Sequence, residues 1–383
     1  MLPPDTKVMS ADDHLIEPAN LWLDHIDPAF LDRAPRIHVD ENGREYWLYE
    51  DERYYTTMGS CRPLEGHPET GYPPAPGTAN YDEIRPGCYD PVERLKDMDV
   101  DGVWAQLCFP NYARFAGHRF YLGDKDLELG EACIRAYNDH LLDVWCATDP
   151  ERLHGAVILP LADVGAAVAE LERVIPKGAS AIAFSENPTV LGLPSVHTEH
   201  WDPLFALAEE AGVPICQHIG SSSKLMSTSP DAPTGVMVTL LGINSVMAGV
   251  DWMLGTTLDR FPDLNVILSE GGAGWVPYIV ERADKVWHDK RINPSELGFA
   301  PKGTRPPSEI FAQHINVCLV DEHFALRAID DIPVDNLLWE GDYPHGDGLW
   351  PNNRTYLEKA MADVPDDVAV KIASTNLQRL LAR

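Results

Sequence analysis

The chain alternates between short apolar runs and longer segments whose apolar residues recur at the spacing of a helix. The short runs predict buried strands, and they begin near residues 8, 101, 153, 180, 212, 264, 314 and 335. Helices are predicted between them, most clearly over 162–178 and 202–212, and again over 365–383. Strands that alternate with helices form a parallel sheet, and eight such runs predict an α/β fold of the (β/α)8 TIM barrel type.

The segment from residue 24 to residue 90 breaks this alternation and forms a long insertion after the first predicted strand. It is rich in Pro, Gly, Tyr and charged residues, and Asn42-Gly43 predicts the turn of a hairpin. Loops that follow barrel strands lie on the catalytic face, so we predict a lid or a wall of the substrate pocket. A surface subdomain or a dimer contact fits equally well. No linker divides the rest, so residues 1–383 are predicted to be a single domain.

Composition narrows the class of protein. Sixty acidic residues against 30 basic ones give a net charge of -30, which repels nucleic acids and anionic membrane surfaces. The first residues carry no basic leader with an apolar core, and no later run of about 20 uncharged apolar residues is found. Seven scattered cysteines without a CxxC pair predict reduced thiols and no thiolate metal site. We therefore expect a cytoplasmic enzyme with a small-molecule substrate and no nucleic acid or membrane partner.

Side chains that bind metals stand at the carboxyl ends of several predicted strands. In a barrel all these ends meet at one face, so residues some 200 positions apart converge there. Residues two apart on a strand project to the same side. Neutral imidazoles and carboxylates bind divalent first-row metals. The sequence therefore predicts a metal site formed by Asp12, His14, His218, Glu270 and Asp342.

Several segments resemble the amidohydrolase superfamily, specifically the amidohydrolase-related branch that includes the aminocarboxymuconate-semialdehyde decarboxylase-like enzymes. The resemblance spans nearly the whole chain and rests on DDHLIEPANLW, FPNYARFAG, AYNDHLLDVW, ERLHGAVILPLAD, QHIG, FPDLNVILSEGGAGWVPYIVERAD and WEGDYPHGDGLWPNN. It implies a TIM barrel with a metal held by Asp12, His14, His218 and Asp342. It also implies a homo-oligomer, expected to be a homodimer.

The chain departs from the family pattern at two positions. Asp12 takes the first place of the usual His-x-His pair, as it also does in the decarboxylase branch. Glu270 stands where many relatives carry a histidine. Carboxylates in place of imidazoles favour Fe, Mn or Zn with oxygen ligands. Glu270 is predicted to act as a general base, to bridge two metal ions, or to cap the turn from Gly271 to Gly274.

Three reactions are compatible with this site. In hydrolysis, the first choice, a metal-activated water attacks a carbonyl and Asp342 or Glu270 accepts the proton. Nonoxidative decarboxylation would use the same ligands, but the absence of a histidine at position 270 counts against it. An oxygenase with two Fe ions would hydroxylate an apolar substrate. His345 is predicted to contact Asp342 or the substrate as a catalytic group, or to anchor its loop.

The insertion and its neighbourhood carry a group of aromatic residues, which are Trp22, Tyr46, Trp47, Tyr49, Tyr54 and Tyr55. They favour a cyclic or aromatic small molecule, but aromatic residues equally pack an insertion onto its barrel.

Overall fold

Eight parallel strands form the central sheet of the computed structural model, which describes residues 2–55, 61–65, 79–123, 125–289, 303–346 and 348–382. Their order is β1-β5-β6-β7-β8-β9-β10-β11. The bounds are Met9–His14, Ala105–Phe109, Leu153–Val157, Ala181–Ala183, Ile215–His218, Val266–Ser269, Ile315–Leu319 and Leu337–Trp339. The sheet closes where the N–H of Asp342 donates to the carbonyl of Asp12 at 2.9 Å and the N–H of His14 donates to that of Tyr343 at 2.6 Å. The predicted (β/α)8 TIM barrel is thereby confirmed.

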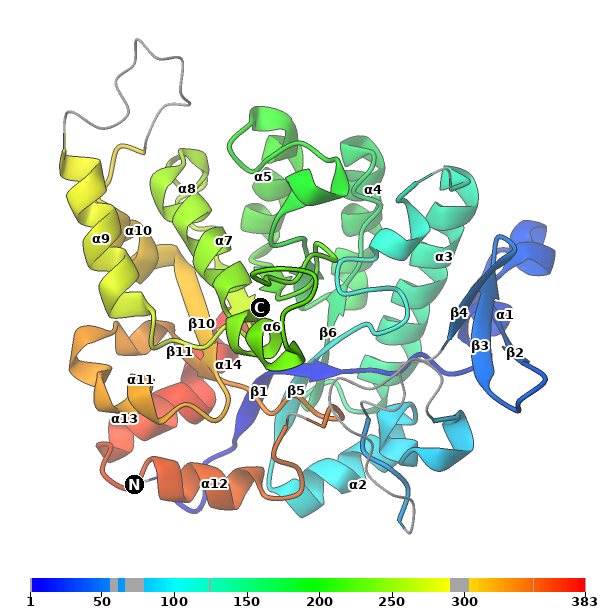
Figure 1. The fold of residues 1–383 in the computed structure, drawn as a ribbon, viewed down its shortest axis with the longest axis horizontal. Coiled ribbons are helices and arrows are strands. Elements are labelled where there is room, and N and C mark those ends of the chain that lie inside the picture. Colours follow the sequence, from blue (N-terminus) through cyan, green and yellow to red (C-terminus); the bar gives the residue numbers. More distant parts are fainter. Residues whose placement is uncertain are drawn as a thin grey trace.

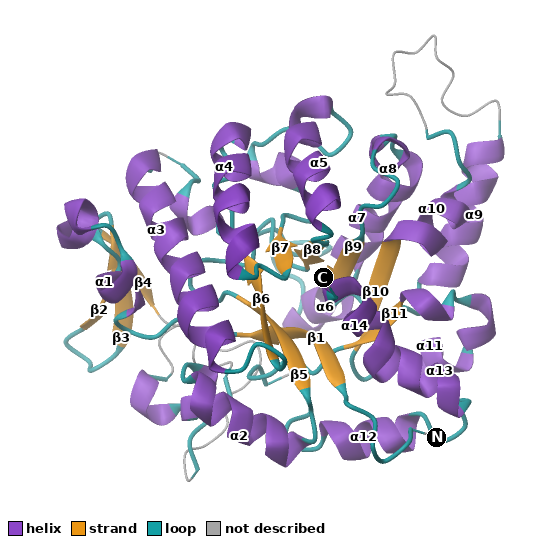
Figure 2. Ribbon diagram, turned by 180° about the vertical axis from the view of Figure 1, so that it is seen from behind, coloured by secondary structure: helices purple, strands orange, loops and turns teal. Residues whose placement is uncertain are grey.

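Helices surround the strands on the outside of the barrel (Figures 1 and 2). The longer ones are α2 Pro91–Asp101, α3 Leu127–His140, α4 Val164–Val174, α5 Asp202–Ala211, α7 Ile243–Leu254, α9 Val276–His288, α10 Pro307–His314 and α12 Asn353–Ala360. The shorter ones are α1 Leu21–His25, α6 Thr234–Leu240, α8 Thr257–Arg260, α11 His323–Arg327, α13 Asp366–Val370 and α14 Asn376–Leu381.

Local sequence explains where the predicted helices begin and end. The Asp163 side chain accepts a hydrogen bond from the N–H of Ala166 and so caps the first turn of α4. In α5 a proline occupies the first turn, and Gly212 ends the helix with φ 64, a left-handed conformation that favours glycine. Both helices lie within the ranges predicted from the sequence.

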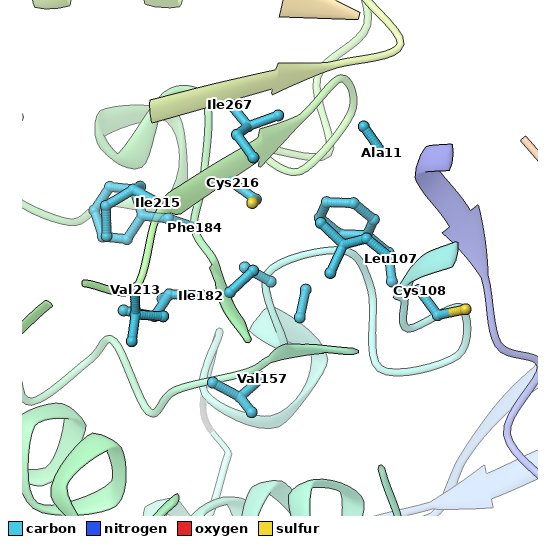
Figure 3. Packing of buried hydrophobic residues seen from close by; sticks show 14 of the residues in the cluster. Ala11, Leu107, Cys108, Val157, Ile182, Phe184, Val213, Ile215, Cys216 and Ile267 are labelled. Carbon is cyan, nitrogen blue, oxygen red and sulfur yellow. The ribbon is translucent and has the colours of Figure 1, made fainter. Parts of the chain in front are cut away.

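The interior of the barrel is filled by aliphatic and small side chains. Figure 3 shows part of this buried core, in which Cys216 of β8 and Ile267 of β9 are in register on neighbouring strands. Both are fully buried. The seven cysteines are free, and all except half-buried Cys146 are buried. Because side chains fill the interior of the barrel, an active site is expected at the end where the carboxyl ends of the strands meet.

The insertion folds as an antiparallel sheet that lies beside α3 at one side of the barrel (Figure 1). Its strands are β2 Arg36–Val39, β3 Glu45–Tyr49 and β4 Glu52–Tyr55, and Gly43 adopts φ 77 at the predicted hairpin turn. Trp47 packs edge-on against Trp22 and stacks on Tyr112, with ring centroids 5.0 and 4.6 Å apart. These aromatic rings therefore attach the sheet to the barrel. Residues 56–60 and 66–78 of the insertion lie outside the described residues.

The expectation that no apolar run is long enough to span a membrane needs correction for one pair of helices. Residues Thr234–Leu254 meet the length and composition of such a span, with 39% of the most apolar window buried. The segment comprises α6 and α7, and α7 buries Ala248, Gly249, Trp252 and Met253. A helix that covers a barrel passes the same test, so composition alone is weak support for a membrane span.

His140 makes the stability of this fold depend on pH. Burial lowers the pKa of this histidine to about 4, with His25 as a second cause, against 6.5 in the unfolded chain. Between these values the unfolded state binds more protons, so stability falls as the pH drops from 6.5 toward 4. One such group contributes up to about 1.4 kcal/mol per pH unit. We expect His140→Gln to flatten this part of a denaturation profile by about one proton.

His197 provides a control, because its pKa is shifted in the opposite direction to that of His140. Its pKa is raised by a hydrogen bond with Asp251, whose carboxylate lies 3.1 Å from the ring. Its contribution to stability is therefore present at low pH and lost as the pH rises. His197→Gln should cost more stability at pH 5.5 than at pH 8. The prediction for His140 is contradicted if both variants change the slope in the same direction.

Candidate metal centre

The six residues singled out by the sequence come together at the carboxyl ends of the strands. Asp12 and His14 belong to β1, and His218 is the last residue of β8. Glu270 directly follows β9, whereas Asp342 and His345 lie in the segment after β11. Asp12, His14, His218 and Asp342 are almost completely buried, while Glu270 and His345 are 13% and 12% exposed. Four of the six side chains are thus shielded from solvent, whereas Glu270 and His345 remain partly accessible to it and define the open side of the site.

Their ligand atoms surround one small space. The Nε2 atom of His14 lies 3.3 Å from Asp342 Oδ1 and 3.7 Å from Asp12 Oδ1. The Nε2 atom of His218 lies 3.3 Å from Asp12 Oδ2, from Glu270 Oε2 and from His14 Nε2. Two sets of three have ligand atoms within 4.8 Å of one another: Asp12 with His14 and His218, and His14 with Asp342 and His345.

Three carboxylate oxygens at this site lack a hydrogen-bond partner, which indicates what kind of ligand the site can bind. Both carboxylate oxygens of Asp12 and Oδ2 of Asp342 are buried without a hydrogen-bond partner among the described residues. A buried carboxylate without a partner costs several kcal/mol, by order of magnitude, unless a cation compensates its charge. Two imidazoles and two carboxylates are also the donor types that divalent first-row metals prefer. The residues present therefore fit a divalent metal ion.

Electrostatics place three of the four buried ligands in the protonation states that a metal requires. Burial lowers the pKa of His14 to about 4 and that of His218 well below its usual value, so both rings are neutral and offer a lone pair. Burial pushes the pKa of Asp342 up, but His345 and His14 outweigh it and hold the pKa below its usual range. Burial raises the pKa of Asp12, and Glu340, Glu270 and Asp342 add to this. The Asp12 carboxylate is therefore the ligand that most needs a compensating cation.

The backbone is strained at both acidic residues that follow a strand. Glu270 has φ 58 and Asp342 has φ 52, which lie in the left-handed region that residues other than glycine seldom adopt. Such strain costs about 1–3 kcal/mol per residue and persists only where the surrounding structure enforces it. Here the N–H of Glu270 donates to Glu340 Oε2 at 3.0 Å, and that of Asp342 donates to Asp12. With this backbone, the Glu270 carboxylate lies 3.3 Å from His218 Nε2 and the Asp342 carboxylate lies 3.3 Å from His14 Nε2.

Glu340 also belongs to this site, although the sequence analysis did not predict it. It is fully buried between β11 and Asp342, and burial, with Asp342 as a further cause, raises its pKa to about 8. Its Oε1 atom has no hydrogen-bond partner among the described residues. Residues 340 and 342 are two apart in WEGD, but the φ of 52 at Asp342 departs from an extended chain, so the spacing alone did not predict that both belong to the site.

Asn111 and Phe115, both in FPNYARFAG, were also missed. Nδ2 of Asn111 lies 3.3 Å from His345 Nε2, and His345 Nδ1 lies 2.9 Å from Asp342 Oδ1. The Phe115 ring lies 4.0 Å from that of His218, centroid to centroid. The segment after β5 therefore covers one side of the metal centre.

Glu322 caps the glycine turn that was one of the predicted positions of Glu270. Its carboxylate accepts hydrogen bonds from the N–H groups of Ala273 and Gly274, each at 2.7 Å. Glu270 instead points toward His218. Two predicted roles of Glu270 stay predictions: proton transfer and metal binding.

Comparison with known proteins finds a matching family model and a similar relative. The family model described as Amidohydrolase matches residues 28–383. The chain is similar to Decarboxylase orsB of Emericella nidulans, with 32% identity over 236 residues, 56% of this chain and 65% of that relative. The match thus spans slightly less than two thirds of the relative's length.

Solved structures share the fold over the whole chain. An amidohydrolase from Mycobacterium avium subsp. paratuberculosis K-10 has a TM-score of 0.74 at 20% identity, covering 99% of this chain and 100% of that one. A variant of 5-carboxyvanillate decarboxylase from Novosphingobium aromaticivorans DSM 12444 has a TM-score of 0.64 at 15% identity, covering 99% and 98%. That structure holds manganese and 3-methoxy-4-hydroxy-5-nitrobenzoic acid.

Proposed function

The chain belongs to the amidohydrolase family of metal-dependent enzymes, and from this premise we propose that it catalyses the nonoxidative decarboxylation of a small cyclic or aromatic carboxylic acid. The observation that carries the proposal is the buried set of Asp12, His14, His218 and Asp342, with His345 beside it on the open side. Similar proteins named as decarboxylases support this reaction over the hydrolysis that the sequence favoured.

The metal, when bound to the buried set, would polarise the substrate's carboxylate and an adjacent oxygen. In the reaction the bond between the ring carbon and the carboxylate breaks, its electron pair stays on the carbon, and carbon dioxide leaves. That carbon then takes up one proton. The proposal assigns this proton to His345, whose ring is oriented by contacts with Asp342 at 2.9 Å and Asn111 at 3.3 Å and whose side chain is 12% exposed.

Glu270 is the second group that can exchange a proton with the substrate. It is the most exposed carboxylate of the set and lies 3.3 Å from His218 Nε2. Many relatives carry a histidine here, so the proposal assigns Glu270 the role that this histidine fills. Manganese, zinc or iron would each suit the mixed nitrogen and oxygen donors.

A second candidate function is supported by the number of carboxylates. Glu270 and Glu340 add two acidic side chains to Asp12 and Asp342, and all four interact electrostatically in the same buried space. Carboxylate-rich sites can hold two metal ions about 3.5–4 Å apart. With two Fe ions such a centre would activate dioxygen to hydroxylate an apolar substrate.

The proposal also includes the class of substrate, the oligomeric state, the location and the role of the insertion. The net charge of -30 supports a small-molecule substrate over nucleic acids or anionic membranes. We propose a homodimer that works in the cytoplasm, with the insertion over 24–90 as a wall of the substrate pocket.

Metal analysis combined with two assays distinguishes these functions. We expect about one Mn, Zn or Fe per chain, and release of carbon dioxide from hydroxylated benzoic acids under strictly anaerobic conditions. Glu270→His should keep the metal and keep or raise this activity, because it restores the residue that many relatives use. About two Fe per chain with substrate-dependent consumption of dioxygen would instead support the oxygenase. Release of carbon dioxide without any bound metal would contradict both.

A further inference from the structure

A cavity of about 840 Å³ lies between the sheet of the insertion and the segment 114–125. Its size is within the range of small-molecule sites. Its walls combine the basic residues Arg33, Arg36, Arg114, Arg119 and Lys125 with the acidic residues Asp32, Glu50, Asp51 and Glu52. The cavity touches none of the six metal-centre residues, so these charged side chains do not serve to hold the metal.

Three of these cations are already engaged. Arg33 pairs with Asp126 at 2.8 Å, and Lys125 lies 3.3 Å from Glu52 and 3.7 Å from Glu50. Arg36 donates to two backbone carbonyls. Their charges and hydrogen bonds are thus used within the protein itself.

Arg114 and Arg119 differ, because neither has a carboxylate within ion-pair distance among the described residues. Arg119 is held in a fixed orientation: Nε donates to the carbonyl of Tyr112, and the guanidinium lies over the rings of Tyr54 and Tyr112, 4.1 and 4.4 Å from their centroids. Its two terminal nitrogens have no hydrogen-bond partner in that part of the chain. A guanidinium fixed in this way presents its remaining donors in the fork that matches a carboxylate or phosphate.

Arg114 and Arg119 lie close enough to act on the same neighbours. His118 lines the same cavity, and its pKa is lowered to about 3 by burial and then by Arg114 and Arg119. Glu52 balances part of this positive charge, because its pKa is lowered first by a hydrogen bond from Tyr54 and further by Lys125 and Arg119. Arg114 reaches the cavity from a strained position with φ 66. An anion bound between the two guanidiniums would reduce their mutual repulsion.

The cavity is also close to the metal centre along the chain. Arg114 lines the cavity, and the next residue, Phe115, packs on His218 and His14 with centroid distances of 4.0 and 5.1 Å. Consecutive Cα atoms are about 3.8 Å apart, so one residue separates the cavity wall from the metal ligands.

We propose that Arg119 and Arg114 form a subsite for an anionic group, a carboxylate or a phosphate, on an elongated substrate whose reacting end lies at the metal centre. The inference rests on the proposed function only for the position of that reacting end. It predicts a substrate with two charged ends, because the group that binds the arginines is remote from the group that reacts.

Isothermal titration calorimetry on the metal-loaded protein tests the subsite without turnover. The probes are inorganic phosphate and succinate, which separate the two sources of negative charge. We expect at least one probe to bind, and Arg119→Gln to weaken it about tenfold or more through loss of charge-assisted hydrogen bonds. Arg114→Gln should weaken it as well, and this second variant keeps the test valid if the packing of Arg119 proves essential for folding.

Arg33→Gln is the matched control, because it removes a cation of the same wall that is already paired. It should change binding less than twofold or so, by the small effect of a solvated pair. Equal affinity in the wild type and in both the Arg114 and Arg119 variants would overturn the proposal, and so would no binding of either probe. Arginine-dependent binding without release of carbon dioxide would preserve the subsite and reject decarboxylation.

Discussion

Replacing Asp12 by asparagine is expected to remove the metal and activity while stabilising the metal-free protein. Asp12 is buried, and neither of its oxygens has a hydrogen-bond partner among the described residues. Loss of a direct ligand should weaken metal binding by more than about 100-fold, the upper figure for residues that only support a ligand. The neutral amide removes an uncompensated charge beside Glu340, Glu270 and Asp342, so the metal-free protein should unfold at a higher temperature.

Metal content and thermal unfolding with and without a chelator measure both effects. Asp13→Asn is the matched control, because the neighbouring side chain is equally buried but accepts hydrogen bonds from Gln106 Nε2 at 3.1 Å and from the N–H of Tyr343 at 2.8 Å. This control should destabilise the protein and retain the metal. A loss of stability in metal-free Asp12→Asn would show that Asp12 is a structural carboxylate and not a ligand.

Replacing Arg94 by methionine should be the most destabilising substitution outside the metal centre. The side chain is fully buried in α2 and donates to the carbonyls of Gly87 and His14, each at 2.6 Å, and to Gln106 Oε1 at 2.9 Å. It also compensates the buried charge of Asp13. Methionine fills much of the volume but leaves three acceptors and one carboxylate without their partner, which costs about 3–5 kcal/mol.

Denaturation by urea measures this loss as a lower midpoint at an unchanged slope. Arg135→Met serves as control, because Arg135 is 57% exposed and its partner Glu170 remains bound to Arg173. Its effect should stay below about 1 kcal/mol, as for other surface ion pairs. Since Arg94 holds the carbonyl of His14, the variant should also bind metal less tightly. Equal midpoints for the two variants would contradict the prediction.

The strands and the metal-centre residues were accessible from the sequence for a physical reason. A buried parallel strand must be apolar over its whole length, so the eight barrel strands stand out as short runs. Once a barrel is inferred, its geometry brings all strand carboxyl ends to one face. That rule alone brings together Asp12, His14, His218, Glu270 and Asp342, although no local contact links them.

The residues that were missed depend on contacts between distant segments. Glu340 belongs to the metal centre because the barrel closes between β1 and the segment after β11. Glu322 caps the glycine turn because β9 and β10 are neighbours in the sheet. These relations follow from strand order and closure, which local spacing does not encode.

The sequence by itself determined the barrel, the turn of the hairpin and the residues at the strand ends, because each depends on a period or a chain direction that is read locally. Only the tertiary structure decided which charged side chains form ion pairs. Arg114 and Arg119 look like any other arginines in the sequence, and they stand out because both line a cavity and neither has a carboxylate within ion-pair distance among the described residues. The net effect of a charge depends on its neighbours in space, and those neighbours are set by the fold.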